Sequence, residues 1–225
     1  MNAGAVAASV TADKTEGAPA VPEGDDALRA NTYALLGSLL AAPPPAPLIA
    51  LLGRITPAEI GGGDMAQDTA RDMAQDMIQA WEVLRLAGAR ASIEALDDEY
   101  HELFIGVGRG ELVPYGSWYM TGFLMDQPLA VLRRDLDELG FERKEGIKEP
   151  EDHVAALLET MGLMISAGDV SVDTQRRFFQ SHMGPWMKTF FLDLQKASTA
   201  RFYRAVGQFG EQFIEFERTY LTMLV

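Results

Sequence analysis

Apolar residues recur along most of the chain at the spacing of a helix, and sustained two-residue alternation is absent from the sequence. The clearest stretch is the last one, where apolar residues follow at intervals of four and three. These residues are Phe202, Val206, Phe209, Phe213, Phe216, Tyr220 and Met223. They would lie on one face of a helix about six turns long. Because most of them are aromatic, the pattern favours packing into the protein's own core over a coiled-coil zipper, which prefers Leu and Ile.

Earlier segments show the same periodicity, bounded by capping residues and helix breakers. Ser92 and Asp126 are predicted helix caps, and Gly140 is a predicted helix end. Three consecutive prolines at 43–45 must end the first helix. The sequence therefore predicts an all-α protein of about eight to ten helices. The predicted helical segments are 25–42, 64–87, 92–105, 126–139, 150–167, 172–183, 184–197 and 198–225.

Two regions differ in composition from these helices. Residues 1–24 are rich in Ala, Gly, Thr and Pro, and no basic residue precedes their small apolar patch, unlike a secretory signal. We expect a disordered tail followed by one helical domain over 25–225. Glycine and charged residues cluster at 140–150, which predicts a hinge linker there. Such a linker could let the C-terminal helices exchange between two chains, so a monomer and a domain-swapped homodimer both stay open.

Composition narrows the possible functions. The chain has no cysteine, which excludes disulfides, thiolate metal sites and iron–sulfur ligation by its own residues. Its net charge of -14 argues against binding nucleic acid or an anionic membrane surface and favours a basic partner. No apolar run approaches the roughly 18 residues of a membrane span, so stable membrane insertion is not expected.

The segment Glu149-Pro150-Glu151-Asp152-His153 is the most unusual polar cluster in the sequence. Pro150 suits the first position of a helix, and the acids after it would then favour the positive end of the helix dipole. This interpretation leaves His153 unexplained.

A helical metalloenzyme or hydrolase using His101, His153 and His182 is the alternative function. Against it, the histidines lack the spacing of a helical metal site. Ser117 does not lie in a nucleophile elbow. The glycine-rich loop 106–117 is not a Walker A loop. It contains Gly-x-Gly-x-Gly, but no predicted strand precedes it and no helix start follows at the offset that dinucleotide binding needs.

Several motifs, taken in order, resemble the TorD/DmsD/NarJ family of redox-enzyme maturation chaperones. The resemblance covers roughly residues 28–218 and begins with "ANTYALLGSLLAAPP" in the first helix. "EYHELFIGVGRGELVPYGSWY" is similar to the family's Leu-Phe-x-Gly…Pro-x-x-Ser-x-Tyr segment, and "EPEDH" to its Glu-Pro-x-Asp-His signature. "FFQSHMGPWMKTFFLDL" resembles its His-x-x-Pro-Trp-x-x-x-Phe element, and "ARFYRAVGQFGEQFIEFE" its closing helix.

The resemblance implies a cytoplasmic chaperone without catalytic activity or a cofactor of its own. Such proteins bind the apo catalytic subunit of a molybdopterin oxidoreductase, often through its twin-arginine signal peptide, until the cofactor is inserted. A basic and then apolar peptide would fit an acidic rim beside an apolar groove. The residues expected to bind this client are Leu103, Phe104, Pro114, Tyr115, Ser117, Trp118, Tyr119, Glu149, Glu151, Asp152 and His153.

Overall fold

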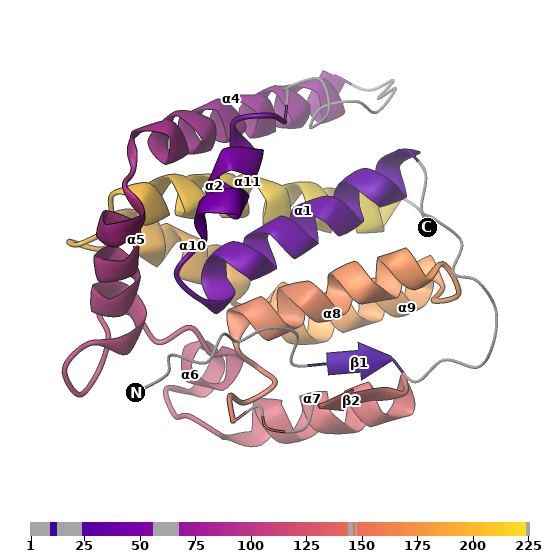
Figure 1. Ribbon diagram of the computed structural model, residues 1–225. Helices are drawn as coiled ribbons and strands as arrows, with labels where there is room; N and C mark the ends of the chain where they lie inside the picture. Colours follow the sequence, from indigo (N-terminus) through magenta and orange to yellow (C-terminus); the bar gives the residue numbers. More distant parts are fainter. Residues whose placement is uncertain (1–9, 13–23, 56–67, 144–145, 147, 224–225) are drawn as a thin grey trace. The chain divides into compact units, whose positions relative to one another are not determined.

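The computed structural model describes residues 10–12, 24–55, 68–143, 146 and 148–223. Within these residues the chain forms ten α-helices, two short π-helical turns and two three-residue strands (Figure 1). The predicted all-α class and number of helices are confirmed. The elements are β1 (Val10–Ala12), α1 (Gly24–Ala41), α2 (Ala46–Leu52), α4 (Asp68–Arg90), α5 (Ile93–Tyr100), η1 (His101–Ile105), α6 (Gly116–Thr121), α7 (Gln127–Glu138), β2 (Phe141–Arg143), α8 (Val154–Ala167), α9 (Val172–Phe178), η2 (Phe179–Met183), α10 (Met187–Lys196) and α11 (Phe202–Met223).

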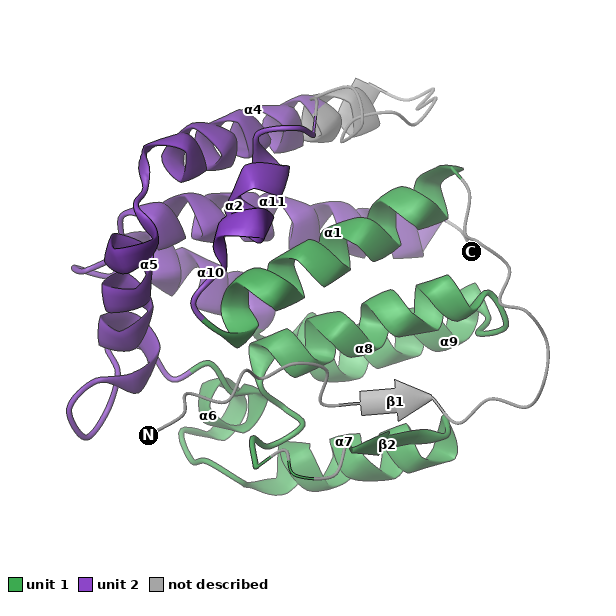
Figure 2. Ribbon diagram, viewed as in Figure 1, with its two compact units in different colours: residues 1–42, 114–186 green, residues 43–113, 187–225 purple. Residues whose placement is uncertain are grey.

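The chain divides into two compact units, each built from two separate stretches (Figure 2). Unit 1 contains residues 1–42 and 114–186, and unit 2 contains residues 43–113 and 187–225. The predicted linker at 140–150 does not separate the units, because it joins α7 to α8 inside unit 1. One physical reason is that Phe141 is buried in this segment, which ties it to the unit.

Unit 1 is organised around the packing of α1 against α8. Both helices bury apolar faces, including Tyr33 and Leu36 of α1 and Leu158 of α8. The fully buried Arg29 donates a hydrogen bond to Asp26 Oδ1 within α1 at 2.8 Å. It also donates to Gln175 Oε1 at 3.1 Å, and this second bond links α1 to α9. A buried guanidinium requires such partners, because an unpaired charge in the interior is costly.

Strands β1 and β2 form a two-stranded antiparallel sheet in which Val10 is paired with Arg143 and Ala12 with Phe141. Strand β1 departs from the disordered tail expected over residues 1–24, because its backbone groups pair with those of β2. The rest of that tail, residues 1–9 and 13–23, lies outside the described residues, so its predicted disorder stays a prediction.

Unit 2 is organised around α11, which packs against α4 and α10. The predicted apolar face of α11 is confirmed at five of its seven positions, since Tyr220 is only half-buried and Met223 at the helix end is 50% exposed. Trp81 of α4 meets Phe209 edge to face with ring centroids 5.3 Å apart. The five buried positions are Phe202, Val206, Phe209, Phe213 and Phe216.

Gly210 allows α10 and α11 to approach closely. A Cβ at this position would lie 2.3 Å from Cε1 of Phe191, and that ring is fully buried. We therefore expect Gly210→Ala to lower the free energy of unfolding by about 1–3 kcal/mol, although alanine is the better helix former. Gly53→Ala is the control, because its nearest neighbour would lie 3.6 Å away. Urea unfolding measures both, and equal losses would contradict the close contact.

Candidate functional site

The start of α6 and the segment before α8 are joined by backbone hydrogen bonds within unit 1. The amide of Gly116 donates to the carbonyl of Asp152 at 2.9 Å, and the amide of Val154 donates to the carbonyl of Pro114 at 2.8 Å. Tyr115 and His153 form an isolated antiparallel bridge between these bonds. We call residues 114–117 and 149–154 the α6–α8 junction.

Asp152 connects the two sides of the junction through its side chain as well. Its Oδ2 accepts a hydrogen bond from the amide of Ser117 at 2.8 Å, and the residue is only 3% exposed. Because α6 begins at Gly116, this amide belongs to the first turn of α6 and has no acceptor within the helix. Asp152 therefore caps α6 from a segment that lies 35 residues further along the chain.

The prediction that Pro150 opens the helix is wrong. Helix α8 begins at Val154, and His153 caps it by accepting a hydrogen bond from the amide of Ala155 on Nδ1 at 3.2 Å. Glu151 and Asp152 precede the helix instead of filling its first turn. The physical reason is that pairing with the start of α6 holds Asp152 and His153 in an extended or turn conformation.

Burial determines the protonation of His153. The ring is enclosed and meets Tyr115 edge to face at 5.1 Å, and burial lowers the pKa of His153 to about 4. The imidazole is therefore neutral near pH 7. Since Nδ1 accepts the bond from α8, the proton of the neutral ring is assigned to Nε2.

This pKa predicts a pH-dependent contribution to stability. Between about pH 6.5 and pH 4 the unfolded chain binds a proton at residue 153 that the folded chain excludes. The contribution of the neutral His153 to the free energy of unfolding is thus fully present above about pH 6.5 and is lost as the pH falls towards about 4. We expect wild type to lose more stability over this range than His153→Asn, which keeps a capping acceptor without titrating. Urea unfolding at several pH values tests this, and parallel losses would contradict it.

The two glutamates of the junction have different surroundings. Glu151 is almost buried and accepts a hydrogen bond from Arg133 Nε at 2.9 Å, with Arg143 Nε 3.8 Å away. Glu149 is half-buried and accepts a hydrogen bond from the hydroxyl of Tyr115. Glu151 therefore serves the internal ion pairs of unit 1, whereas Glu149 adds negative charge at a partly exposed position.

Aromatic side chains continue from the junction along α6, and we call Trp118, Tyr119 and Trp186 the aromatic platform. Tyr119 stacks on Trp186 with ring centroids 5.4 Å apart, and Trp186 Nε1 donates to the carbonyl of His182 at 2.7 Å. Trp118 and Tyr119 remain half-buried, whereas Trp186 is almost fully enclosed. The buried Trp186 thus holds Tyr119 in place by stacking, while Trp118 and Tyr119 keep part of their aromatic surface accessible.

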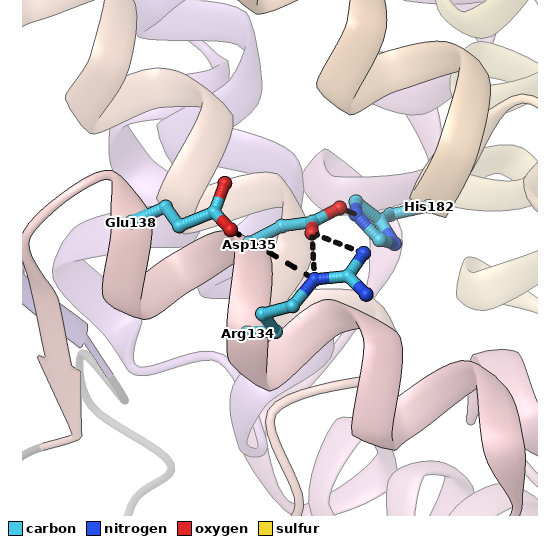
Figure 3. A network of polar contacts seen from close by, with 4 residues as sticks. All are labelled: Arg134, Asp135, Glu138 and His182. Carbon is cyan, nitrogen blue, oxygen red and sulfur yellow. Dashed lines mark hydrogen bonds and ion pairs between the residues drawn. The ribbon is translucent and has the colours of Figure 1, made fainter.

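His182 is also held by α7. Figure 3 shows Asp135 between this ring and Arg134, with Glu138 on the other side of Arg134. His182 Nε2 and Asp135 Oδ2 lie 2.8 Å apart. Burial lowers the pKa of His182 despite the attraction of Asp135. Burial raises the pKa of Asp135, but hydrogen bonds from His182 and Arg134 outweigh it, and the net pKa is lowered. The pair fixes η2 against α7 within unit 1.

The most exposed apolar surface near the junction begins at the end of α6 and continues into the connection to α7. Helix α6 ends at Thr121, with Gly122 as its C-cap, and Asp126 caps α7 by accepting from the amide of Gln127 at 2.7 Å. The residues between them cannot join either helix. Those residues include Met125, which has a φ of 57°, an uncommon value for a residue other than glycine. We call this surface the apolar ridge, and its members are Met120, Phe123, Leu124 and Met125, which are 43%, 71%, 50% and 72% exposed.

Sequence reasoning missed the apolar ridge. The available signal was the tripeptide Phe-Leu-Met between a helix-ending glycine and a capping aspartate. Neither neighbouring helix could bury these side chains, so they were candidates for an exposed apolar surface.

The predicted client-binding residues divide between the units. Leu103 is fully buried in unit 2, and Phe104 packs there against Tyr100 at 5.0 Å and Tyr203 at 5.4 Å. The other predicted residues belong to unit 1. The buried ones are Pro114, Ser117, Glu151, Asp152 and His153, and the partly exposed ones are Tyr115, Trp118, Tyr119 and Glu149. Direct contact with a client therefore stays a prediction, and the accessible residues are its better candidates.

The three histidines of the alternative function have separate local partners. His101 belongs to unit 2, where its Nδ1 lies 2.8 Å from the carbonyl oxygen of Asp97, whereas His153 and His182 belong to unit 1. Among the residues that the structure describes, no cluster of three His, Cys, Asp or Glu side chains could hold a metal ion. None of the described helices is both long and apolar enough to cross a membrane.

A helical fold with an exposed apolar ridge is typical of proteins that bind other polypeptides. A profile of the nitrate reductase delta subunit family matches residues 70–192, which include every residue predicted to bind a client. The chain belongs to this family.

Several relatives carry the name chaperone protein TorD. The chain is 26% identical over 134 residues to TorD of Vibrio parahaemolyticus, covering 55% of this chain and 62% of the relative. It is 24% identical over 137 residues to TorD of Vibrio atlanticus, covering 56% and 64%. The chain thus spans less than two thirds of these relatives. A crystal structure of a candidate redox enzyme maturation protein from Archaeoglobus fulgidus gives a TM-score of 0.47 at 18% identity, over 89% of this chain and 96% of that one.

Proposed function

We propose that this protein is a cytoplasmic chaperone for the apo catalytic subunit of a molybdopterin-dependent oxidoreductase, and that it binds the subunit's twin-arginine signal peptide. In this role it holds the subunit until the cofactor is inserted, and it performs no catalysis itself. The observation that carries the proposal is the family match over residues 70–192. The relatives named chaperone protein TorD support the same role.

The surface of unit 1 suits a peptide that is basic and then apolar. The apolar ridge and the partly exposed aromatic residues of α6 offer contacts for the apolar part. Glu149 adds negative charge beside Tyr115, and the whole chain carries a net charge of -14. Complementary charge would guide the basic part, while apolar burial would supply most of the affinity.

Co-purification tests the proposed partner. The full chain would be produced with each molybdoenzyme catalytic subunit encoded by the same genome, with and without its signal peptide. We expect a stable complex with at least one apo subunit and a weaker one when the signal peptide is deleted. Absence of any complex with the apo subunits would contradict the chaperone role, and equal binding without the signal peptide would contradict only the proposed recognition element.

A further inference from the structure

Two buried polar atoms in the α6–α8 junction have no hydrogen-bond partner among the described residues. These atoms are the hydroxyl oxygen of Ser117 and Oδ1 of Asp152. Ser117 is 0% exposed and Asp152 is 3% exposed. The two residues are already in contact, because the amide of Ser117 donates to the other carboxylate oxygen of Asp152, Oδ2, at 2.8 Å. The two unsatisfied atoms therefore belong to neighbouring buried side chains of the junction.

We propose that one enclosed water molecule binds here and bridges Ser117 Oγ to Asp152 Oδ1. A buried carboxylate oxygen or hydroxyl without a partner is energetically unfavourable, so native proteins rarely leave one unpaired. Enclosed waters typically make about three hydrogen bonds to such groups. A water can donate to the carboxylate and also accept from or donate to the hydroxyl, which satisfies both atoms.

The surroundings favour water over other ligands. Neither side chain is accessible, so a client side chain could not reach Oδ1 without opening the junction. One carboxylate and one hydroxyl are too few oxygen ligands for Mg²⁺ or Ca²⁺. Trp186 Nε1 lies near Gly116, where an added Cβ would be 3.1 Å away, but this N–H already donates to the carbonyl of His182.

The bound water would give Ser117 a positioning role that its sequence context did not suggest. It would connect the first turn of α6 to the segment before α8 a second time, beside the Asp152 cap. This connection fixes the direction of α6, which carries Tyr119 and leads into the apolar ridge. The inference concerns atoms of unit 1 alone and does not depend on the proposed client.

Crystal structures that resolve ordered water test the proposal on the full chain. We expect wild type to show one water within hydrogen-bond distance of Ser117 Oγ and Asp152 Oδ1. Its density should weaken or disappear in Ser117→Ala and persist in Ser38→Ala, whose lost hydroxyl is exposed and donates to the carbonyl of Ala34.

A direct Ser117–Asp152 side-chain hydrogen bond without water would overturn the proposal. A dry junction in wild type, or density unchanged by Ser117→Ala, would overturn it equally. The wild-type structure decides by itself if Ser117→Ala does not fold.

Discussion

Replacing Glu99 with alanine should destabilise unit 2 by at least about 2 kcal/mol. Glu99 is a buried residue of α5, and its carboxylate accepts three backbone hydrogen bonds at the start of α11. The donors are the amides of Arg201 at 2.7 Å, Phe202 at 3.1 Å and Tyr203 at 2.8 Å. Alanine would leave these amides without their acceptor. The bonds from Phe202 and Tyr203 are buried, and each buried unsatisfied donor costs about 1–3 kcal/mol. It would also remove a negative charge from the positive end of the α11 dipole.

Urea unfolding of matched variants checks this expectation. Glu99→Gln keeps one side-chain oxygen acceptor and loses the charge, so its loss of stability should lie between those of wild type and Glu99→Ala. Asp98→Ala is the control, because Asp98 is exposed on the same helix and should change stability by no more than about 0.5 kcal/mol. If Glu99→Ala and Asp98→Ala unfold at the same urea concentration, the three hydrogen bonds contribute nothing measurable.

Helix caps and apolar faces that depend only on neighbouring residues could be predicted from the sequence. Ser92 and Asp126 cap the helices that follow them directly, so their roles can be read from a few neighbouring residues. The apolar face of α11 is equally local, because it depends only on spacing along one helix. The two caps were predicted correctly, and the apolar face of α11 was correct at five of its seven positions. Together these local patterns were enough to predict the all-α class.

Glu99 and Asp152 also cap helices, but those helices lie far away along the chain. Glu99 bonds to α11 about a hundred residues later, and Asp152 bonds to the first turn of α6 that precedes it by 35 residues. Local rules instead assigned Asp152 to the first turn of its own helix, which gave α8 the wrong start. A single sequence contains no local sign of such a contact, because tertiary packing determines which distant helix start lies next to the carboxylate.

The candidate site shows the same division. The segment 149–153 was correctly identified as unusual. However, Glu151, Asp152 and His153 are buried, so they hold the junction together and do not form an exposed binding surface. The apolar ridge was missed because helical periodicity says nothing about residues between two helices. Phe123, Leu124 and Met125 became recognisable only once the ends of α6 and α7 were known.

The apolar ridge should contribute strongly to binding of a client signal peptide. We expect Phe123→Ala to weaken the affinity for a synthetic peptide about 30-fold, which corresponds to about 2 kcal/mol. Phe123 is 71% exposed, so its removal leaves the core of unit 1 intact. Calorimetry on the folded variant measures the change in affinity, and an unchanged melting temperature confirms that the variant is folded.

Val107→Ala separates the ridge from the glycine-rich loop. Val107 is an apolar residue of that loop and is fully exposed, but it belongs to unit 2. If the ridge binds the apolar part of the peptide, Val107→Ala should leave the affinity unchanged while Phe123→Ala lowers it. The opposite result would assign binding to the glycine-rich loop.

Salt distinguishes apolar from electrostatic recognition in the same experiment. Exposed charge pairs contribute less than about 1 kcal/mol each and are screened as ionic strength rises. Apolar contacts of the ridge should persist under these conditions, so raising the salt concentration should weaken wild-type binding only modestly. If high salt abolishes binding while Phe123→Ala has no effect, the peptide is held by charge and the ridge has another role. A modest salt effect together with a large effect of Phe123→Ala would instead identify the ridge as the main source of affinity, with Glu149 and the overall negative charge guiding the basic part of the peptide.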